Sequence, residues 1–196
     1  MFIILTFLLL LFGCSSSVLN FSSFTSQNTY SNLKQANKSC SGRGFISTNA
    51  LGFGKLSFSY KSQRDSTFLD FNDILGRKAV LMWITSDFVI VRNLIENQQY
   101  EYDQIVEFLP FLKVMKPIEI TRMLWGFKPE YYIKTSEKSG FSKKNINLRF
   151  DKHSKTLSGA RFYDGLSEQT IDISITDRNL NDENVNLKKV WKLLEY

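Results

Sequence analysis

The chain has 196 residues, which is enough for one domain with a buried core. Its formal charge of +6 is spread along the chain, which suits an anionic membrane surface or an acidic partner. No dense basic block or nucleic-acid motif accompanies it, so nucleic acid is not expected as a partner. The 17 Phe residues favour strands around a bulky apolar interior.

The amino terminus is an apolar run, Phe2 to Phe12, followed by Gly13 and Cys14. A helix of this length crosses only about half of a bilayer core of ~30 Å, so the run is typical of a signal peptide over residues 1–13. Leu11-Phe12-Gly13-Cys14 resembles a bacterial lipobox. That resemblance implies that Cys14 becomes the first mature residue and carries acyl chains that form a stable anchor.

Ser15 follows this cysteine where an inner-membrane retention signal would have Asp, so the resemblance favours the periplasmic face of the outer membrane. The alternative is a plain secretory signal in which Cys14 is lost or free. Residues 14–40 then read as a lipidated terminus, a Ser- and Asn-rich tether and a short helix over 29–39. With Cys14 lipidated, Cys40 has no disulfide partner and is expected as a small buried residue.

Residues 41–196 are expected to form the folded domain. Segment 53–61 alternates regularly, with Leu56, Phe58 and Tyr60 on one face. Other strands are expected at 43–48, 67–85 (a hairpin) and 88–94, and their close succession indicates antiparallel order. Some strands are apolar on one side and some on both. The predicted fold is therefore mainly β with short helices (α+β), a curved antiparallel half-barrel whose concave face is covered.

The loop of the 67–85 hairpin is unusual, because Ile74 and Leu75 stand at a tip that normally faces water. Asp73 and Gly76 beside them are ordinary turn residues. One interpretation is that the loop folds back and buries both side chains. The other is that they contact something apolar, such as a membrane, a partner or an acyl chain.

Two short helices are predicted between the strands. The first spans 102–114, with Asp103 as a possible cap and Pro110 as a kink or end. The second spans 117–125 and is bounded by Pro117 and Gly126. Two amphipathic helices inserted here would make a lid over the concave face, or would simply complete the core.

Strand patterns resume at 130–134, 145–150, 157–163 and 169–176. Residues 151–155 are expected as a hairpin turn, which places the single histidine, His153, at a polar surface position. Segment 187–194 fits a final strand better than a short helix. Ile146, Leu148 and Phe150 are expected to point inward, as are Ile171, Ile173 and Ile175.

From Gly42 to Phe127 the order of short motifs resembles the outer-membrane lipoprotein receptor family LolB. The motifs are Arg43-Gly44, a second strand ending at Tyr60, the loop Ile74-Leu75-Gly76, the helix start Tyr100 to Asp103, and Pro117 to Gly126. Ile74 stands where the family has Pro. The resemblance implies a half-barrel with helices over an apolar cavity, a fold shared with the carrier LolA. It also implies that Leu75 protrudes and delivers lipoproteins into the membrane.

A cavity that binds acyl chains needs a lining of apolar side chains with few groups that require hydrogen-bond partners. The candidate cavity residues are Leu56, Phe58, Leu69, Phe71, Val80, Met82 and Ile84 of the sheet, with Ile120, Met123 and Trp125 of the lid. The expected partners are acyl chains of lipoproteins or other lipids and a LolA-like carrier, with the protein itself monomeric.

No Ser/His/Asp set, carboxylate pair or metal cluster is evident in the sequence, so neither an enzyme nor a cofactor is expected. The competing hypothesis is an envelope lipoprotein whose half-barrel has a filled core and which acts as a structural or protein-interaction module.

Overall fold

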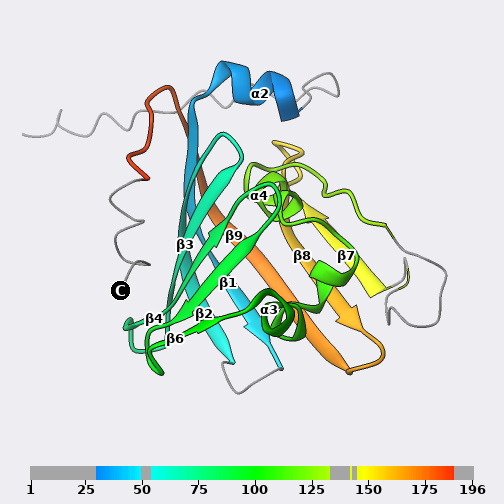
Figure 1. Cartoon of the computed structure of the whole chain (residues 1–196). Helices are drawn as coiled ribbons and strands as arrows, with labels where there is room; N and C mark the ends of the chain where they lie inside the picture. Colours follow the sequence, from blue (N-terminus) through cyan, green and yellow to red (C-terminus); the bar gives the residue numbers. More distant parts are fainter. Residues whose placement is uncertain (1–29, 50–53, 133–141, 143–144, 188–196) are drawn as a thin grey trace, which may run out of the picture.

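The computed structural model describes residues 30–49, 54–132, 142 and 145–187 (Figure 1). In this part of the chain, short helices accompany a large sheet. The elements in chain order are α2 (Tyr30–Ala36), β1 (Ser39–Thr48), β2 (Lys55–Gln63), β3 (Ser66–Asn72), β4 (Lys78–Ile84), β5 (Val89–Asn93), β6 (Gln98–Tyr100), α3 (Tyr102–Phe108), the 3-10 helix η2 (Pro110–Lys113), α4 (Ile118–Leu124), β7 (Ile146–Phe150), β8 (Leu157–Asp164) and β9 (Gln169–Asn181).

The described strands form one open nine-stranded sheet in the order β6-β5-β4-β3-β2-β1-β9-β8-β7. All neighbouring pairs are antiparallel, and β1 joins the two halves by pairing with β2 on one side and β9 on the other. The expected class, mainly β with antiparallel strands and short helices, is confirmed.

The helical segment connects the two edges of this sheet, because it follows β6 and precedes β7. Within the described residues, α4 contacts β3, β4 and β8, η2 contacts β8, and α3 contacts β5. Ile105, Phe111 and Ile120 from these helices share one buried cluster with Phe58 and Met82 from the sheet. The core therefore lies between one face of the sheet and the helices (Figure 1).

The ends of the helices follow local signals. The α3 helix begins after Glu101, whose backbone N–H donates to Oε1 of Gln104 at 2.9 Å, so the expectation that Asp103 caps it was wrong. Pro110 ends the α-helix and begins η2, as its missing N–H predicts. Gly126 adopts φ 100° after α4, a conformation that glycine allows without a Cβ clash.

Two expectations about strands were wrong, and one strand was missed. Of the strand expected at 130–134, residues 130–132 form no strand, and residues 133–134 lie outside the described residues. The Tyr132 N–H donates to the Val114 carbonyl at 2.8 Å. The polar strand β6 was not predicted, because it lacks any apolar alternation. Phe150 is 46% exposed instead of inward, since the β7–β8 register shifts between Arg149 and Phe150 and reverses the alternation there. Most of segment 187–194 lies outside the described residues.

Candidate functional site

The strand register brings the inward side chains of β2, β3 and β4 into rows across the sheet. Because residues directly opposite each other share a face, these rows make a continuous surface. The three rows are Phe58, Phe71 and Val80; Tyr60, Leu69 and Met82; and Ser62, Thr67 and Ile84. The surface is apolar in its first row, carries the Tyr60 hydroxyl in the second, and carries two hydroxyls in the third.

Two glycines of β1 make room for the aromatic rings of β2. A Cβ on Gly42 would lie 2.7 Å from the Tyr60 ring and collide with the Asp177 carbonyl oxygen. A Cβ on Gly44 would likewise collide with the Phe58 ring. The Arg-Gly pair at the start of the sheet therefore has a structural reason, because β1 must leave its inner face bare for these rings.

An apolar cavity of about 30 Å³ lies between this surface and the helices. Six of the ten residues expected to line it do so, and the lining has no polar member. It consists of Phe58, Leu69, Phe71, Met82, Ile120 and Met123 from the expected set, with Ile46, Leu109, Phe111, Leu124, Ile173 and Ile175 in addition. The additional residues come mostly from β1, β9 and η2, and the pairing of β1 with β9 places Ile173 and Ile175 beside Ile46. The volume is about the share of one water molecule in the liquid.

The other four expected residues are buried but do not line this cavity. Leu56, Val80 and Ile84 belong to the core. Trp125 is fully buried, and its Nε1–H donates to Oγ of Ser62 at 2.7 Å. Trp125 instead lies beneath a second, polar hollow at the end of the sheet next to α2.

The carboxyl end of α4 is held to the sheet by buried hydrogen bonds. The Leu124 carbonyl accepts from the Tyr60 hydroxyl at 3.0 Å and from Nε of Arg178 at 2.8 Å. Arg178 also donates to the Leu157 carbonyl at 2.6 Å. Burial raises the pKa of Tyr60 well above its usual range, so the hydroxyl stays a donor. Strands β2, β8 and β9 thus meet at the end of one helix.

A second set of buried hydroxyls holds the body of α4. Thr121 and Thr67 are hydrogen-bonded through their Oγ1 atoms at 2.8 Å, and Thr67 donates to Ser62 Oγ at 2.8 Å. The Trp125 indole N–H also donates a hydrogen bond to this Ser62 oxygen. Buried polar groups without partners destabilise a fold by about 1–3 kcal/mol each, so this network fixes α4 in one position.

The segment α3–η2 is held differently. Its inward side chains Ile105 and Phe111 make apolar contacts, including a Phe111–Phe162 ring pair with centroids 4.8 Å apart. Its polar link to the sheet is the Lys113–Asp164 ion pair at 3.1 Å. Burial raises the pKa of Asp164, but hydrogen bonds from the Leu166 N–H and Lys113 outweigh it and lower that pKa overall.

The β3–β4 loop does not fold back. Ile74 is 87% exposed and Leu75 is 72% exposed. Oδ1 of Asp73 accepts the backbone N–H groups of Leu75 and Arg77, each at 2.9 Å, and this lowers the pKa of Asp73. Gly76 adopts φ 78°. A hydrogen-bonded turn therefore holds two large apolar side chains in solvent.

A third exposed apolar side chain stands beside this loop and was not predicted. Ile95, in the β5–β6 turn, is 64% exposed. The neighbouring Leu94 N–H donates to the Ala79 carbonyl at 2.8 Å, and Ala79 directly follows the start of β4 at Lys78. The β4–β5 pairing thus brings both turns to the same end of the sheet, opposite α2 (Figure 1).

The remaining residues singled out in the sequence are Cys40, His153 and Cys14. Cys40 is buried, as expected, and burial raises its pKa to about 11. His153 is exposed in the turn organised by Asp151, whose Oδ1 accepts its N–H at 2.9 Å. Cys14 lies outside the described residues. Among the residues that are described, no group of three His, Cys, Asp or Glu side chains is placed to hold a metal ion, and no helix has the length and apolar character to cross a membrane.

Comparison with known proteins adds no assignment to this geometry. A scan against models of protein families finds no match, and neither does a search of curated protein sequences.

Proposed function

We propose that this protein is a lipid-anchored receptor of the outer membrane that binds acyl chains and helps to insert lipoproteins there. The supporting observation is the combination of an apolar cavity under the helices with an exposed pair, Ile74 and Leu75, at a hydrogen-bonded turn. The resemblance to the LolB family from Gly42 to Phe127 supports the same reading. In this proposal the open sheet curves as a half-barrel, and α3, η2 and α4 are its lid.

Binding would come from apolar contact alone. The cavity lining offers no hydrogen-bond donor or acceptor from its side chains, so it would not select a particular headgroup or chain. Each buried methylene of a chain would contribute about 0.8 kcal/mol. Such a site suits a receptor that handles many lipoproteins with similar acyl chains.

The lid must move for a chain to enter, because about 30 Å³ holds no more than a single small group. The two parts of the lid are not equally free to do so. Buried hydrogen bonds from Tyr60, Arg178 and Thr67 hold α4. The α3–η2 segment leaves the sheet by breaking apolar contacts and one ion pair, so we assign the opening to it.

The exposed loop would provide the contact with the membrane. Ile74 and Leu75 already face solvent, so inserting them into lipid removes apolar surface from water at about 25 cal/mol per Å² without any rearrangement. Ile95 at the same end would add to this contact. Acyl chains released there enter a better apolar phase than the cavity.

The proposed anchor at Cys14 allows this orientation. From Cys14 to Tyr30 there are 16 residues, which reach at most about 55 Å. The longest strand, β9, has 13 residues and is about 43 Å long. The loop can therefore meet the membrane although α2 lies at the opposite end of the sheet.

The test uses transfer of a lipoprotein from the purified full chain to vesicles. Leu75→Glu should abolish transfer while binding of a fluorescent fatty acid persists, because Leu75 is exposed and does not line the cavity. Leu166→Glu is the matched control, since Leu166 is also an exposed apolar residue of a turn. Equal transfer by both variants would contradict the role of the loop.

The alternative function is a structural or interaction module with a filled core. The small volume of the cavity is the observation that favours it. Under this alternative the full chain takes up no fatty acid at any concentration below micelle formation, and Met123→Trp, which fills the space, changes nothing. Under the main proposal Met123→Trp weakens uptake.

A further inference from the structure

A hollow with a greater volume than the apolar cavity has no part in the function proposed above. It has a volume of about 260 Å³ and lies at the α2 end of the sheet, away from the exposed loop. Four segments far apart in sequence form it: the end of α2, the β2–β3 turn, the end of α4 and the chain after β9. Its lining is Lys34, Asn37, Lys38, Arg64, Trp125 and Asn184, which includes three cations and no acidic residue.

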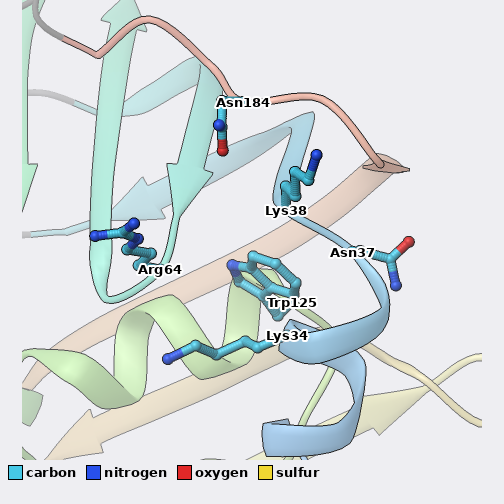
Figure 2. Close-up of a pocket in the computed structure, with 6 residues that line it drawn as sticks. All are labelled: Lys34, Asn37, Lys38, Arg64, Trp125 and Asn184. Carbon is cyan, nitrogen blue, oxygen red and sulfur yellow. The ribbon is translucent and has the colours of Figure 1, made fainter.

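Figure 2 shows how these side chains lie around the Trp125 ring, with Arg64 on one side and Asn37 and Lys38 on the other. The ring is fully buried and its N–H is bonded to Ser62, so it forms a fixed floor. Polar and charged groups surround this floor. Arg64 comes from the β2–β3 turn, which the Lys34–Asp65 ion pair joins to α2, and Asn184 comes from the chain after β9.

Two of the three positive charges of this hollow have no ion-pair partner within the described residues. Lys34 forms an ion pair with Asp65. For the side chains of Lys38 and Arg64, the described part of the chain offers neither an ion-pair partner nor a hydrogen-bond acceptor. Like charges brought to one hollow repel each other unless an anion joins them.

The amide groups are partly used. Asn37 Nδ2 donates to the Leu33 carbonyl at 3.1 Å, and Asn184 Oδ1 accepts from Gln63 Nε2 at 3.1 Å. The Asn184 amide N–H groups have no acceptor among the described residues and are available to a ligand. A planar guanidinium, an ammonium and an amide together match the oxygens of a phosphate group, which carries more than one negative charge.

We propose that this hollow binds a phosphate group, with Lys38 and Arg64 neutralising it and Asn184 donating to it. The volume lies just below that of ordinary small-ligand sites, about 300 Å³ and more, and therefore suits a phosphate with a short polar substituent. Such a group occurs on a phospholipid headgroup and on small soluble phosphate esters. The site does not depend on the apolar cavity, so either proposal can fail alone.

The experiment measures backbone amide NMR shifts of Lys38 and Asn184 in the full chain, held in a non-ionic sugar detergent. Glycerol 3-phosphate probes the soluble source. Short-chain phosphatidylglycerol in the micelle probes the lipid source, with diacylglycerol as its phosphate-free match. Saturable shifts with either phosphate compound and none with diacylglycerol are expected. Saturation by the lipid alone assigns a headgroup, and saturation by both assigns the phosphate ester itself.

The variant Lys38→Glu/Arg64→Glu should weaken binding by at least about tenfold, because each residue is a charged partner of the phosphate. Lys116→Glu/Lys152→Glu makes the same change in net charge at exposed sites outside the lining of the hollow and should bind as wild type. Arg64→Lys keeps the charge but loses the planar guanidinium, which can donate two parallel hydrogen bonds to a phosphate. An intermediate affinity is therefore expected. Shifts that never saturate, or an equal loss in both double variants, would overturn the proposal.

Discussion

The two parts of the helical segment differ in how they are attached to the same sheet. α4 is fixed by buried hydrogen bonds to Tyr60, Thr67 and Arg178, whereas α3–η2 is attached by apolar contacts and the partly exposed Lys113–Asp164 pair. Apolar contacts are non-directional and tolerate sliding, while a buried hydrogen bond is lost outright when its partner moves. If the helices act as the proposed lid, this difference makes α3–η2 the part that would open without unfolding the domain.

The largest effect is expected where α4 is joined to the sheet. Trp125→Ala removes a fully buried indole and should lower the free energy of unfolding by about 3–5 kcal/mol. Urea unfolding followed by far-UV circular dichroism measures this. A loss below about 1 kcal/mol would mean that the α4 end is not a fixed point.

A smaller effect is expected from the hydroxyl network. Thr121→Val keeps the shape of the side chain but leaves the Thr67 hydroxyl without this partner, which should lower the free energy of unfolding by about 1–3 kcal/mol. Thr121→Ser retains the hydroxyl and is the matched control. If valine and serine have equal effects, packing and not the hydrogen bond holds α4.

The ion pair of η2 should contribute less and depend on pH. Lys113→Met should lower the free energy of unfolding at neutral pH by about 1 kcal/mol or less, because Lys113 is partly exposed. The pKa of Asp164 is lowered in the folded protein, so its contribution is present above the unfolded value of about 3.9 and is lost as pH falls further.

Urea titrations of wild type and Lys113→Met at neutral pH and at about pH 3 measure this dependence. The difference between the two proteins should shrink at the acidic end, as Asp164 becomes protonated. A difference that grows on acidification would show that another group carries the effect.

The smallest effect on stability is expected at the exposed loop. Leu75→Glu should change the free energy of unfolding by no more than about 0.5 kcal/mol, since Leu75 is 72% exposed. Thermal unfolding beside Leu166→Glu measures it. A large loss would mean that Leu75 has a structural role.

The sequence predicts most strands because their alternation is local. In β2 the side chains Leu56, Phe58 and Tyr60 are buried on one face, as their spacing indicates. The polar β6 escapes this signal, because an edge strand needs no apolar face. Residues 130–132 have strand-like composition but find no neighbouring strand, so tertiary pairing overrides local preference.

The site was predicted only in part for a related reason. Strand spacing identifies Leu69, Phe71 and Met82 as inward, but it cannot say which other strand lies beside β1. The pairing of β1 with β9 brings Ile173 and Ile175 to the cavity from more than a hundred residues away. The sequence allowed two interpretations of the loop, with Leu75 either buried or exposed. Leu75 is exposed, and the bond from its N–H to Oδ1 of Asp73 holds the turn in this form.

The central claim is that α3–η2 opens to admit an acyl chain while α4 stays in place. Spin labels on Lys61→Cys/Glu107→Cys report the position of α3 against β2, and labels on Lys61→Cys/Lys116→Cys report the start of α4; all three sites are exposed. Distances measured by pulsed electron paramagnetic resonance, with and without a fatty acid, compare the two. The account predicts that the first distance lengthens and the second does not change. No change in the first distance at saturating fatty acid would contradict it.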